Sequence, residues 1–396
     1  MHTAGVEPDT TAVNAAISAL DKCASIEQAQ ELFSHMQHTA AHLLDCTSYS
    51  ALIDAYAKRG LIAEANDLVA DMRARGIPPD SPMLVTLVDM YGKSGAHDNA
   101  RDALHSLLLL AAEHQGAGTE DEARPRVPGR RSRAALKQDV LRAFNTLIDA
   151  YLRFSKPEEA RALLEELHAR AKMQVSAPPD IFTYTILMRN LTPGPAAPKQ
   201  ARILYDEMLA ANVRGDQALF NSVMEVLIQS RDFASAADAF DLARREAVDP
   251  YDYCLALSPA TAKLDLHGFS RAAAASALEW VLRQDPSRLR HGPEAGSDAA
   301  SREPVPAHSG CDLVLVTGRE MTYVGEPNLV RAIIINALRA KRLPFFAADS
   351  PNRRGRYAPG DGRLVVSAEE WRRHRERLER GTVGDDTLDY IDREFH

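Results

Sequence analysis

The sequence predicts two fold classes in one chain: an α-solenoid of stacked helical hairpins, followed by a small α/β domain. The first prediction rests on a motif that returns about every 35 residues, a period typical of helical repeats. One copy spans 47–80 and another spans 144–180, and both close on Pro-Pro-Asp. The second prediction rests on strand-like and helix-like segments that alternate after Pro250.

Each repeat contains two segments with the apolar spacing of amphipathic helices. In the second repeat, Leu52 and Tyr56 share one face of a first helix, and Leu68 and Met72 share one face of a second. A hairpin with two apolar faces cannot bury both alone, so neighbouring hairpins are expected to stack. The expected repeats span 10–45, 46–80, 81–139, 141–180, 181–216 and 217–250.

The later part of the chain reads differently. A strand is expected at 263–268, a helix at 272–283, a buried strand at 312–318, a helix at 328–341, a strand at 362–367 and a charged helix at 368–380. The predicted organisation is a repeat array over 1–250 with a disordered insertion at 113–137, a linker at 251–261, an α/β domain at 262–380 and an acidic tail at 381–396.

Composition narrows the class of protein. The 45% hydrophobic and 26% charged content is typical of a globular chain. The four cysteines form no CxxC pair, which argues against a zinc site and favours a reducing compartment. No apolar run is long enough for a membrane span.

The net charge is unevenly distributed along the chain. From Leu264 onward 20 basic residues balance 20 acidic ones, so the repeat region carries the whole net charge of −8. RNA binding there would depend on clustered cations or on base edges.

The first residues parallel the end of a repeat. Residues 1–9 end on Gly-Val-Glu-Pro-Asp, and residues 72–80 end on Gly-Ile-Pro-Pro-Asp. The parallel predicts that the chain begins inside a repeat, as an N-terminally truncated form of a longer protein. Any targeting segment would then lie upstream of Met1.

The motif Tyr/Phe-Asn/Ser/Thr-x-Leu-Ile-x-Ala-Tyr with its Pro-Asp ending resembles the pentatricopeptide repeat family. Tetratricopeptide repeats have a similar period but expect Trp and Gly-Tyr at fixed places, which this sequence lacks. The resemblance covers roughly 1–250 and implies a right-handed superhelix. Its groove is expected to bind single-stranded RNA, about one base per repeat.

In that family the fifth and last residues of a repeat together select the base. Carried over by position, the resemblance implies uracil at Asn14/Asp45 and Asn145/Asp180, guanine at Thr185/Asp216, and a weak guanine-type pair at Ser50/Asp80. Val85 cannot form a hydrogen bond, Asp139 ends the third repeat, and Asn221 has no Asp in register. An Asp before a helix is also an ordinary N-cap, so each Asp has a purely structural alternative.

The segment Leu264-Asp-Leu-His-Gly268 resembles the LDLHG motif of the Smr domain, which follows pentatricopeptide repeats in plant and algal organellar proteins. The segment 317–320 matches the TGxG motif of that family in part, because Glu320 replaces its second Gly. The resemblance implies that Asp265 and His267, on one face of a strand, can serve in nucleic-acid cleavage. It also implies phosphate contacts at Thr317, Gly318 and Arg319.

His267 would act as general base or acid, and Asp265 would orient it or hold a divalent metal such as Mg²⁺ or Mn²⁺. The structural alternative is that both side chains only shape a strand end. The Glu320 carboxylate, which repels a phosphate unless a metal intervenes, favours this alternative.

The resulting hypothesis is a monomeric, organellar single-stranded RNA-binding protein that acts in RNA processing, stability or translation. The expected location is the chloroplast, with the mitochondrion as the alternative, and other organellar gene-expression proteins are expected partners. An Smr endonuclease activity is a further expectation. The alternative function is a protein-binding scaffold that has an acidic solenoid and an inactive Smr domain.

Overall fold

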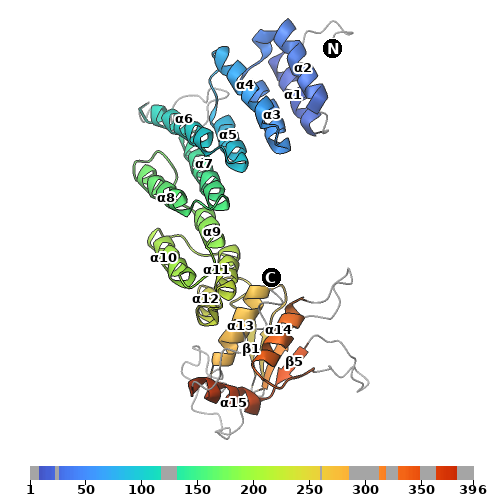
Figure 1. Ribbon diagram of the computed structural model, residues 1–396, viewed down its shortest axis with the longest axis vertical. Coiled ribbons are helices and arrows are strands. Elements are labelled where there is room, and N and C mark those ends of the chain that lie inside the picture. The colour runs from blue at the N-terminus through green and yellow to red at the C-terminus, as the bar shows by residue number, and fades with distance from the viewer. Residues whose placement is uncertain are drawn as a thin grey trace. The chain divides into compact units, whose positions relative to one another are not determined.

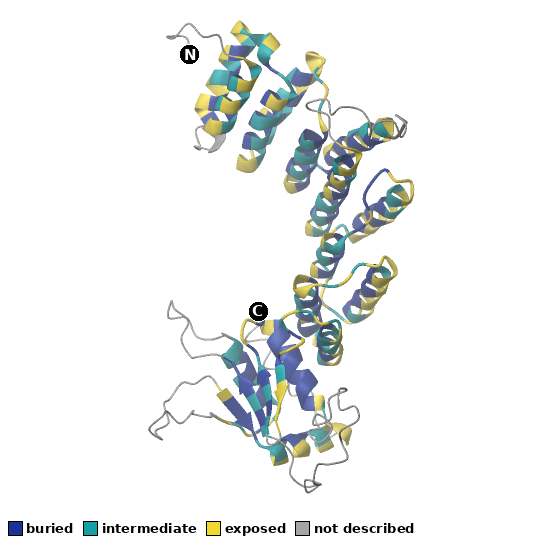
Figure 2. Ribbon diagram, turned by 180° about the vertical axis from the view of Figure 1, so that it is seen from behind, coloured by how far each residue is buried: buried dark blue, intermediate teal, exposed yellow. Residues whose placement is uncertain are grey.

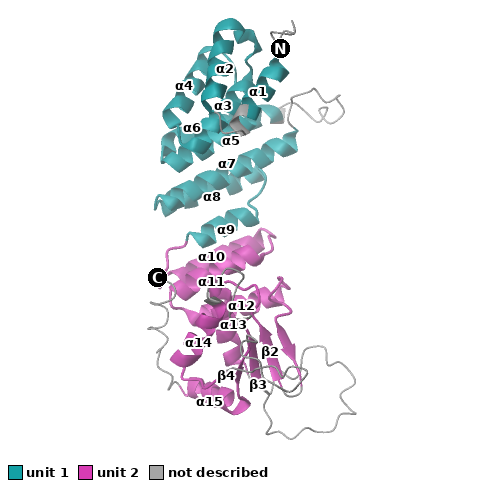
Figure 3. Ribbon diagram, turned by 90° about the vertical axis from the view of Figure 1, so that its right-hand side faces the viewer, with its two compact units in different colours: residues 1–190 teal, residues 191–396 magenta. Residues whose placement is uncertain are grey.

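The computed structural model describes residues 9–22, 26–116, 132–258, 261–284, 312–317, 329–347 and 363–380. Every described element up to Arg245 is helical, and strands alternate with helices after it. The chain divides into two compact units, Met1–Asn190 and Leu191–His396 (Figure 3). Each unit is described by itself below.

Unit 1 is built of helical hairpins (Figure 1). The first helices of successive hairpins contact one another in sequence order, from α1 through α3, α5 and α7 to α9, as stacked repeats require. This arrangement confirms the predicted helical repeats. The helices are α1 Thr10–Lys22, α2 Ile26–Thr39, α3 Cys46–Arg59, α4 Ile62–Ala74, α5 Ser81–Ser94, α6 His97–Gly116, α7 Arg133–Arg153, α8 Pro157–Lys172 and α9 Ile181–Arg189, with a short 3₁₀ turn, η2, at Ala41–Leu43.

The repeat boundaries carry the signals that start and stop these helices. Asp45, Asp80 and Asp180 are the N-caps of α3, α5 and α9, and each carboxylate accepts a backbone N–H at 3.0 Å. Such a cap satisfies one of the N–H groups that a helix leaves without a partner. Gly60 and Gly95 end α3 and α5 at φ 72° and 76°, a left-handed conformation that glycine adopts at little cost.

The core of unit 1 lies where the helices meet, as the buried faces in Figure 2 show. Tyr49 and Phe33 are fully buried, and their rings meet edge to face at a centroid distance of 5.0 Å. Tyr49 comes from the first helix of one hairpin and Phe33 from the second helix of the hairpin before it. The stacking of repeats, and not a single closed core, therefore buries these aromatic side chains.

The boundary of the third repeat differs from the prediction. Residues 113–116 belong to α6 and residues 133–137 belong to α7, so both ends of the expected insertion are helical; its middle lies outside the described residues. Asp139 consequently lies inside α7, where it is 1% exposed and accepts a hydrogen bond from Ser81 at 2.7 Å. Because α7 begins before it, Asp139 cannot cap a helix as Asp45 does.

Unit 2 combines the last helices of the array with a mixed sheet. The strand order is β1-β2-β3-β5-β4; β2 and β3 run parallel, and the other neighbours are antiparallel. Strand β1 falls within the segment 251–261, which the sequence predicted to be a linker. The elements are α10 Ala197–Ala210, α11 Gln217–Gln229, α12 Phe233–Arg245, β1 Leu255–Leu257, β2 Thr261–Asp265, α13 Arg271–Arg283, β3 Asp312–Val316, α14 Leu329–Ala340, β4 Phe346–Ala347, β5 Arg363–Val366 and α15 Ala368–Glu379.

One face of the sheet is buried and the other is more open. Leu264, Leu315 and Leu364 lie opposite one another in the strand register, and each is at most 1% exposed. Lys263 and Asp265 point to the opposite face and keep 45% and 42% of their side chains exposed. Helix α13 is buried along 272–282, since it packs against α11, α12, α14 and α15. Among the described helices, none is long and apolar enough to cross a membrane.

The two helix-ending glycines offer a matched test of the repeat turns. A Cβ at Gly60 would meet nothing within 4 Å, whereas a Cβ at Gly95 would lie 3.0 Å from the Phe154 ring. We expect Gly60→Ala to lower the free energy of unfolding by about 1 kcal/mol, from backbone strain alone. Gly95→Ala should cost about 2 kcal/mol, because the Phe154 ring must also move away from His97. Urea denaturation of both variants measures the difference, and equal losses would contradict it.

Candidate nucleic-acid interface

The pair Asn14 and Asp45 is joined by hydrogen bonds between adjacent hairpins. The Asn14 amide, in α1, donates from Nδ2 to Oδ1 of Asp45 at 3.1 Å. The Ser48 hydroxyl, in the first turn of α3, donates to Oδ1 of Asn14 at 2.5 Å. Ser48 and Asp45 also form a capping box, so the Asn14 amide is attached to a helix start that is itself locked.

The pair Asn145 and Asp180 has the same arrangement. The Asn145 Nδ2 donates to Oδ1 of Asp180 at 3.4 Å, and the Thr183 hydroxyl donates to Oδ1 of Asn145 at 2.7 Å. Asp180 and Thr183 form the capping box of α9. One Asp oxygen therefore caps a helix and orients an Asn at the same time, so the structural and base-reading interpretations of these Asp residues are compatible.

Counting donors and acceptors shows what these Asn side chains can still bind. An amide has two N–H donors and two carbonyl lone pairs, and each of these two links uses one of each. Asn14 and Asn145 are only partly buried. Each therefore offers one donor and one acceptor, and that edge complements the adjacent acceptor and N–H donor on the Watson–Crick edge of uracil.

The remaining predicted pairs are arranged differently. Ser50 and Asp80 both lie at the Cys46 thiol, whose pKa is raised to about 11 by burial and then by the Asp80 charge. Thr185 donates its hydroxyl to the Ile181 carbonyl of its own helix at 2.8 Å. Asp216 caps α11 by accepting the Leu219 N–H at 2.8 Å, and it belongs to unit 2, whereas Thr185 belongs to unit 1.

Asn221 is engaged outside the repeats. Its carbonyl oxygen accepts hydrogen bonds from the Tyr251 hydroxyl at 2.9 Å and from the Ser270 hydroxyl at 2.8 Å. Both donors follow the array in the sequence. Both lone pairs of the amide oxygen are thereby used, a difference from Asn14 and Asn145 that the sequence pattern did not reveal.

Asp265 is the last residue of β2 and His267 lies in the turn that follows, so the two do not share a strand face as predicted. Oδ1 of Asp265 accepts the His267 backbone N–H at 3.1 Å and lies 3.3 Å from Nδ1 of its ring. The His267 side chain is 66% exposed. Lys263, two residues earlier on the same strand face, places Nζ 3.7 Å from the other Asp265 oxygen. The sequence analysis missed Lys263, although the alternation along β2 marks it.

The segment 317–320, which was compared with the TGxG motif, begins at the same edge of the sheet. Strands β2 and β3 are parallel, so their carboxyl ends meet, and the Leu266 N–H donates to the Val316 carbonyl at 2.9 Å. Thr317 is 3% exposed there. Gly318, Arg319 and Glu320 lie outside the described residues. The described part of the chain holds no group of three or more His, Cys, Asp or Glu side chains suited to a metal ion.

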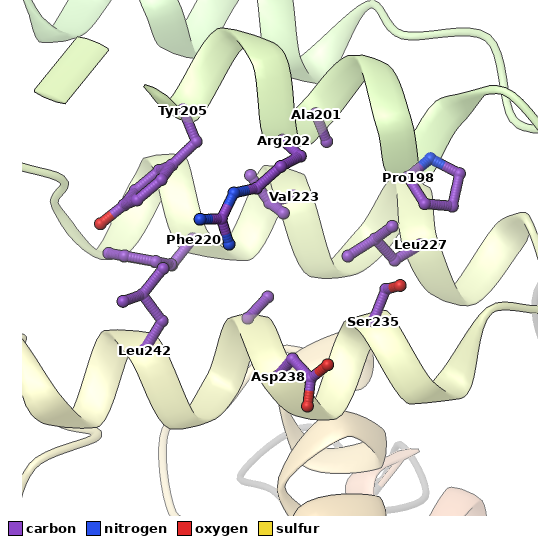
Figure 4. Close-up of a pocket in the computed structure, with 11 residues that line it drawn as sticks. Pro198, Ala201, Arg202, Tyr205, Phe220, Val223, Leu227, Ser235, Asp238 and Leu242 are labelled. Carbon is purple, nitrogen blue, oxygen red and sulfur yellow. The ribbon is translucent and has the colours of Figure 1, made fainter. Parts of the chain in front are cut away.

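A cavity of about 210 Å³ opens among α10, α11 and α12 (Figure 4). Its walls are mainly apolar, with Tyr205, Phe220 and Leu227 among them, and Arg202 and Asp238 also line it. None of the predicted base-reading residues lines this cavity. It is therefore separate from the Asn–Asp links described above.

The repeats match a known family. The family model for the PPR repeat matches residues 47–77 and 142–170. These segments contain most of the second and fourth predicted repeats, including Ser50 and Asn145. The chain thus contains pentatricopeptide repeats.

The curated relatives are pentatricopeptide repeat-containing proteins of Arabidopsis thaliana. One is 33% identical over 113 residues, which are 28% of this chain and 14% of the relative. A mitochondrial one is 23% identical over 174 residues, 44% of this chain and 23% of that protein. A chloroplastic one is 25% identical over 182 residues, 46% of this chain and 20% of that protein. The matches thus span less than a quarter of each of these relatives.

Among solved structures, the chain is similar to the pentatricopeptide repeat protein PPR10 from maize, with a TM-score of 0.38 and 19% identity over 63% of this chain and 36% of that chain. The complex of PPR10 with an 18-nt psaJ RNA element gives a TM-score of 0.24 and 14% identity over 72% of this chain and 48% of that chain. At these TM-scores neither structure bears on the arrangement of this one.

The N-cap role of Asp180 can be measured separately from its link to Asn145. Asp180→Ala should lower the free energy of unfolding by about 1 kcal/mol, because α9 loses its cap. Asp180→Ser should cost only a few tenths, because serine caps a helix nearly as well as aspartate does. Chemical denaturation of both variants checks this, and equal losses would show that capping is not what Asp180 contributes to stability.

Proposed function

We propose that the repeats bind single-stranded RNA and that Asn14 and Asn145 select uracil. The observation that carries the proposal is the recurrence of one arrangement, amide to carboxylate and hydroxyl to amide, at two separate repeat boundaries. Each amide is held in a fixed orientation with one donor and one acceptor left to pair with a base. Such preorganisation lowers the entropy that binding costs.

The charge of the chain agrees with recognition through bases. The net charge is −8, and the repeat region carries it. Binding that releases few counterions depends weakly on salt, whereas binding through many phosphate contacts weakens steeply as salt rises. We therefore expect RNA binding to show sequence preference and to weaken only slightly as the salt concentration rises.

Titration with short RNAs tests base selection. We expect Asn145→Ala to weaken binding to a uracil-rich RNA by about tenfold, because a well-oriented pair of hydrogen bonds is lost. Thr185→Ala should weaken binding to RNAs that carry guanine, and Asp180→Ser should weaken uracil binding while the fold stays stable. Asn99→Ala, which removes the same group from an exposed position in α6, is the matched control. Equal affinity for all RNAs, unchanged by Asn145→Ala, would refute base selection.

We also propose that residues 262–380 form an Smr-type domain in which Asp265 and His267 can cleave RNA. The support is the hydrogen-bonded Asp–His pair at the sheet edge where β3 also ends, just before Thr317. Asp265 accepts the Nδ1 proton and so leaves Nε2 of His267 as the base that takes a proton from the attacking hydroxyl; as the new P–O bond forms, the P–O bond to the leaving oxygen breaks, and that oxygen takes a proton from water. A metal such as Mg²⁺ or Mn²⁺ would polarise the phosphate. Asp265 and His267 alone are too few ligands to hold such a metal. The proton transfer is therefore assigned to His267.

Cleavage of labelled single-stranded RNA tests the second proposal. His267→Ala should lower the rate by about a hundredfold or more, since general-base catalysis contributes that much, while RNA affinity stays unchanged. Asp265→Asn should have a smaller effect in the same direction. His35→Ala, at a repeat surface, is the control. Identical rates for wild type and His267→Ala, with and without added Mg²⁺ or Mn²⁺, would remove His267 from any reaction.

An organellar location fits this function. One relative is named mitochondrial and two are named chloroplastic. The chloroplast is the proposed compartment, with the mitochondrion as the alternative. The proposed role in that organelle is RNA processing, stability or translation. The proposed partners are other gene-expression proteins. Microscopy of the tagged protein distinguishes the two compartments.

A further inference from the structure

The hydrogen bonds of Asn221 share one feature with those of Asn14 and Asn145: a hydroxyl from a following helix start donates to the amide oxygen. At Asn14 and Asn145, a hydroxyl from the first turn of the next hairpin donates to the amide oxygen, from Ser48 and from Thr183. At Asn221 this hydroxyl belongs to Ser270, which is the N-cap of α13, whereas Ser48 and Thr183 are the third residues of α3 and α9. The position that a following repeat would occupy is thus taken by the first helix of the α/β domain.

Helix packing supports this correspondence. In the array, α7 contacts both helices of the preceding hairpin, α5 and α6. In the same way α13 contacts both α11 and α12. Helix α13 therefore packs on the sixth hairpin as the first helix of a seventh would, although its own chain continues into a sheet.

An aromatic cluster closes the junction. Phe240 of α12 lies 5.6 Å from Tyr251, 6.1 Å from Phe269 and 5.7 Å from Trp280, measured between ring centroids. All four side chains are at most 7% exposed. Aromatic side chains of this size contribute strongly to the burial of apolar surface, so this contact is part of the core of unit 2.

Polar contacts then orient the junction. The Trp280 indole N–H donates to Asp241 at 2.9 Å, and the Arg244 guanidinium lies 4.3 Å from the centre of the indole ring. Burial raises the pKa of Tyr251 above its usual range, so its hydroxyl remains protonated and donates to Asn221 at neutral pH. The sixth hairpin thus engages the α/β domain through both apolar and directional contacts.

We propose that Asn221 anchors the α/β domain to the array and takes no part in reading uracil. The inference rests on the proposed function only in comparing Asn221 with the base-reading Asn14 and Asn145. Both lone pairs of the Asn221 carbonyl are occupied, so its amide offers N–H donors alone. The N3–H of uracil needs an acceptor, which this side chain no longer has.

The anchor has a consequence for the Asp–His pair. His267 is three residues before Ser270, a distance that the backbone spans in at most about 11 Å. A fixed Ser270 therefore holds the turn that carries His267 close to the sixth hairpin. Asn221 is a positioning residue for that turn, which it affects through Ser270 without contact to His267.

Hydrogen exchange on the full chain tests the anchor directly. In Asn221→Ala, amides in the segment 269–275 should exchange at least about tenfold faster than in wild type, because Ser270, the N-cap of α13, loses the acceptor of its hydroxyl and Tyr251, which contacts Phe269, loses its acceptor too. Asn221→Asp should restore protection, since a carboxylate accepts both hydroxyls. Asn145→Ala should leave this segment unchanged. Unaltered protection in Asn221→Ala would overturn the anchor.

Selection from a random RNA pool tests the second half. The wild-type chain should enrich a motif, Asn145→Ala should lose one uracil from it, and Asn221→Ala should keep every base preference. Loss of a uracil in Asn221→Ala would overturn the assignment of Asn221. If the wild-type chain enriches no motif, base reading itself fails, and the exchange experiment still decides whether Asn221 is the anchor.

Discussion

The stacked repeats depend on contacts between neighbouring hairpins, and at two repeat boundaries a side-chain link joins the hairpins directly. A helical hairpin exposes apolar surface on two faces, so it is stable only when a neighbour covers that surface. At the boundaries of Asn14 and Asn145, one carboxylate caps the next helix and also accepts the amide of the previous one. At these two boundaries the start of α3 or α9 and its contact with the preceding repeat are therefore fixed by the same carboxylate oxygen.

The same link between amide and carboxylate bears on how an acidic chain could bind RNA. An amide that is bonded on one side keeps a defined edge on the other, and base recognition is proposed to use this edge through hydrogen bonds instead of charge. The end of the array uses the arrangement differently. There the donor to the Asn221 amide is the Ser270 hydroxyl of the α/β domain, and not a hydroxyl from a following repeat. The Asn221 amide thus joins the array to the α/β domain.

Several details of the site could not be read from the sequence. The resemblance to pentatricopeptide repeats paired Asn14 with Asp45 and Asn145 with Asp180, and the structure joins each pair by a hydrogen bond. Asp139 was misplaced because α7 starts before it and buries it. The strand β1 was taken for a linker, since three residues give too short a pattern to identify. The proximity of Lys263 to Asp265 became evident only once the open face of β2 was known.

The sequence by itself determined the helical repeats and the alternation of strands and helices after them, because apolar periodicity and caps are local properties of the chain. Its prediction that Asp265 and His267 share one strand face was wrong, because β2 ends at Asp265 and His267 lies in the turn that follows. Only the tertiary structure decided which polar groups are already used. Asn145 and Asn221 are the same residue type at the same repeat position, yet one keeps an acceptor and the other does not. The difference comes from Tyr251 and Ser270, which the folded chain brings to Asn221 from outside the array.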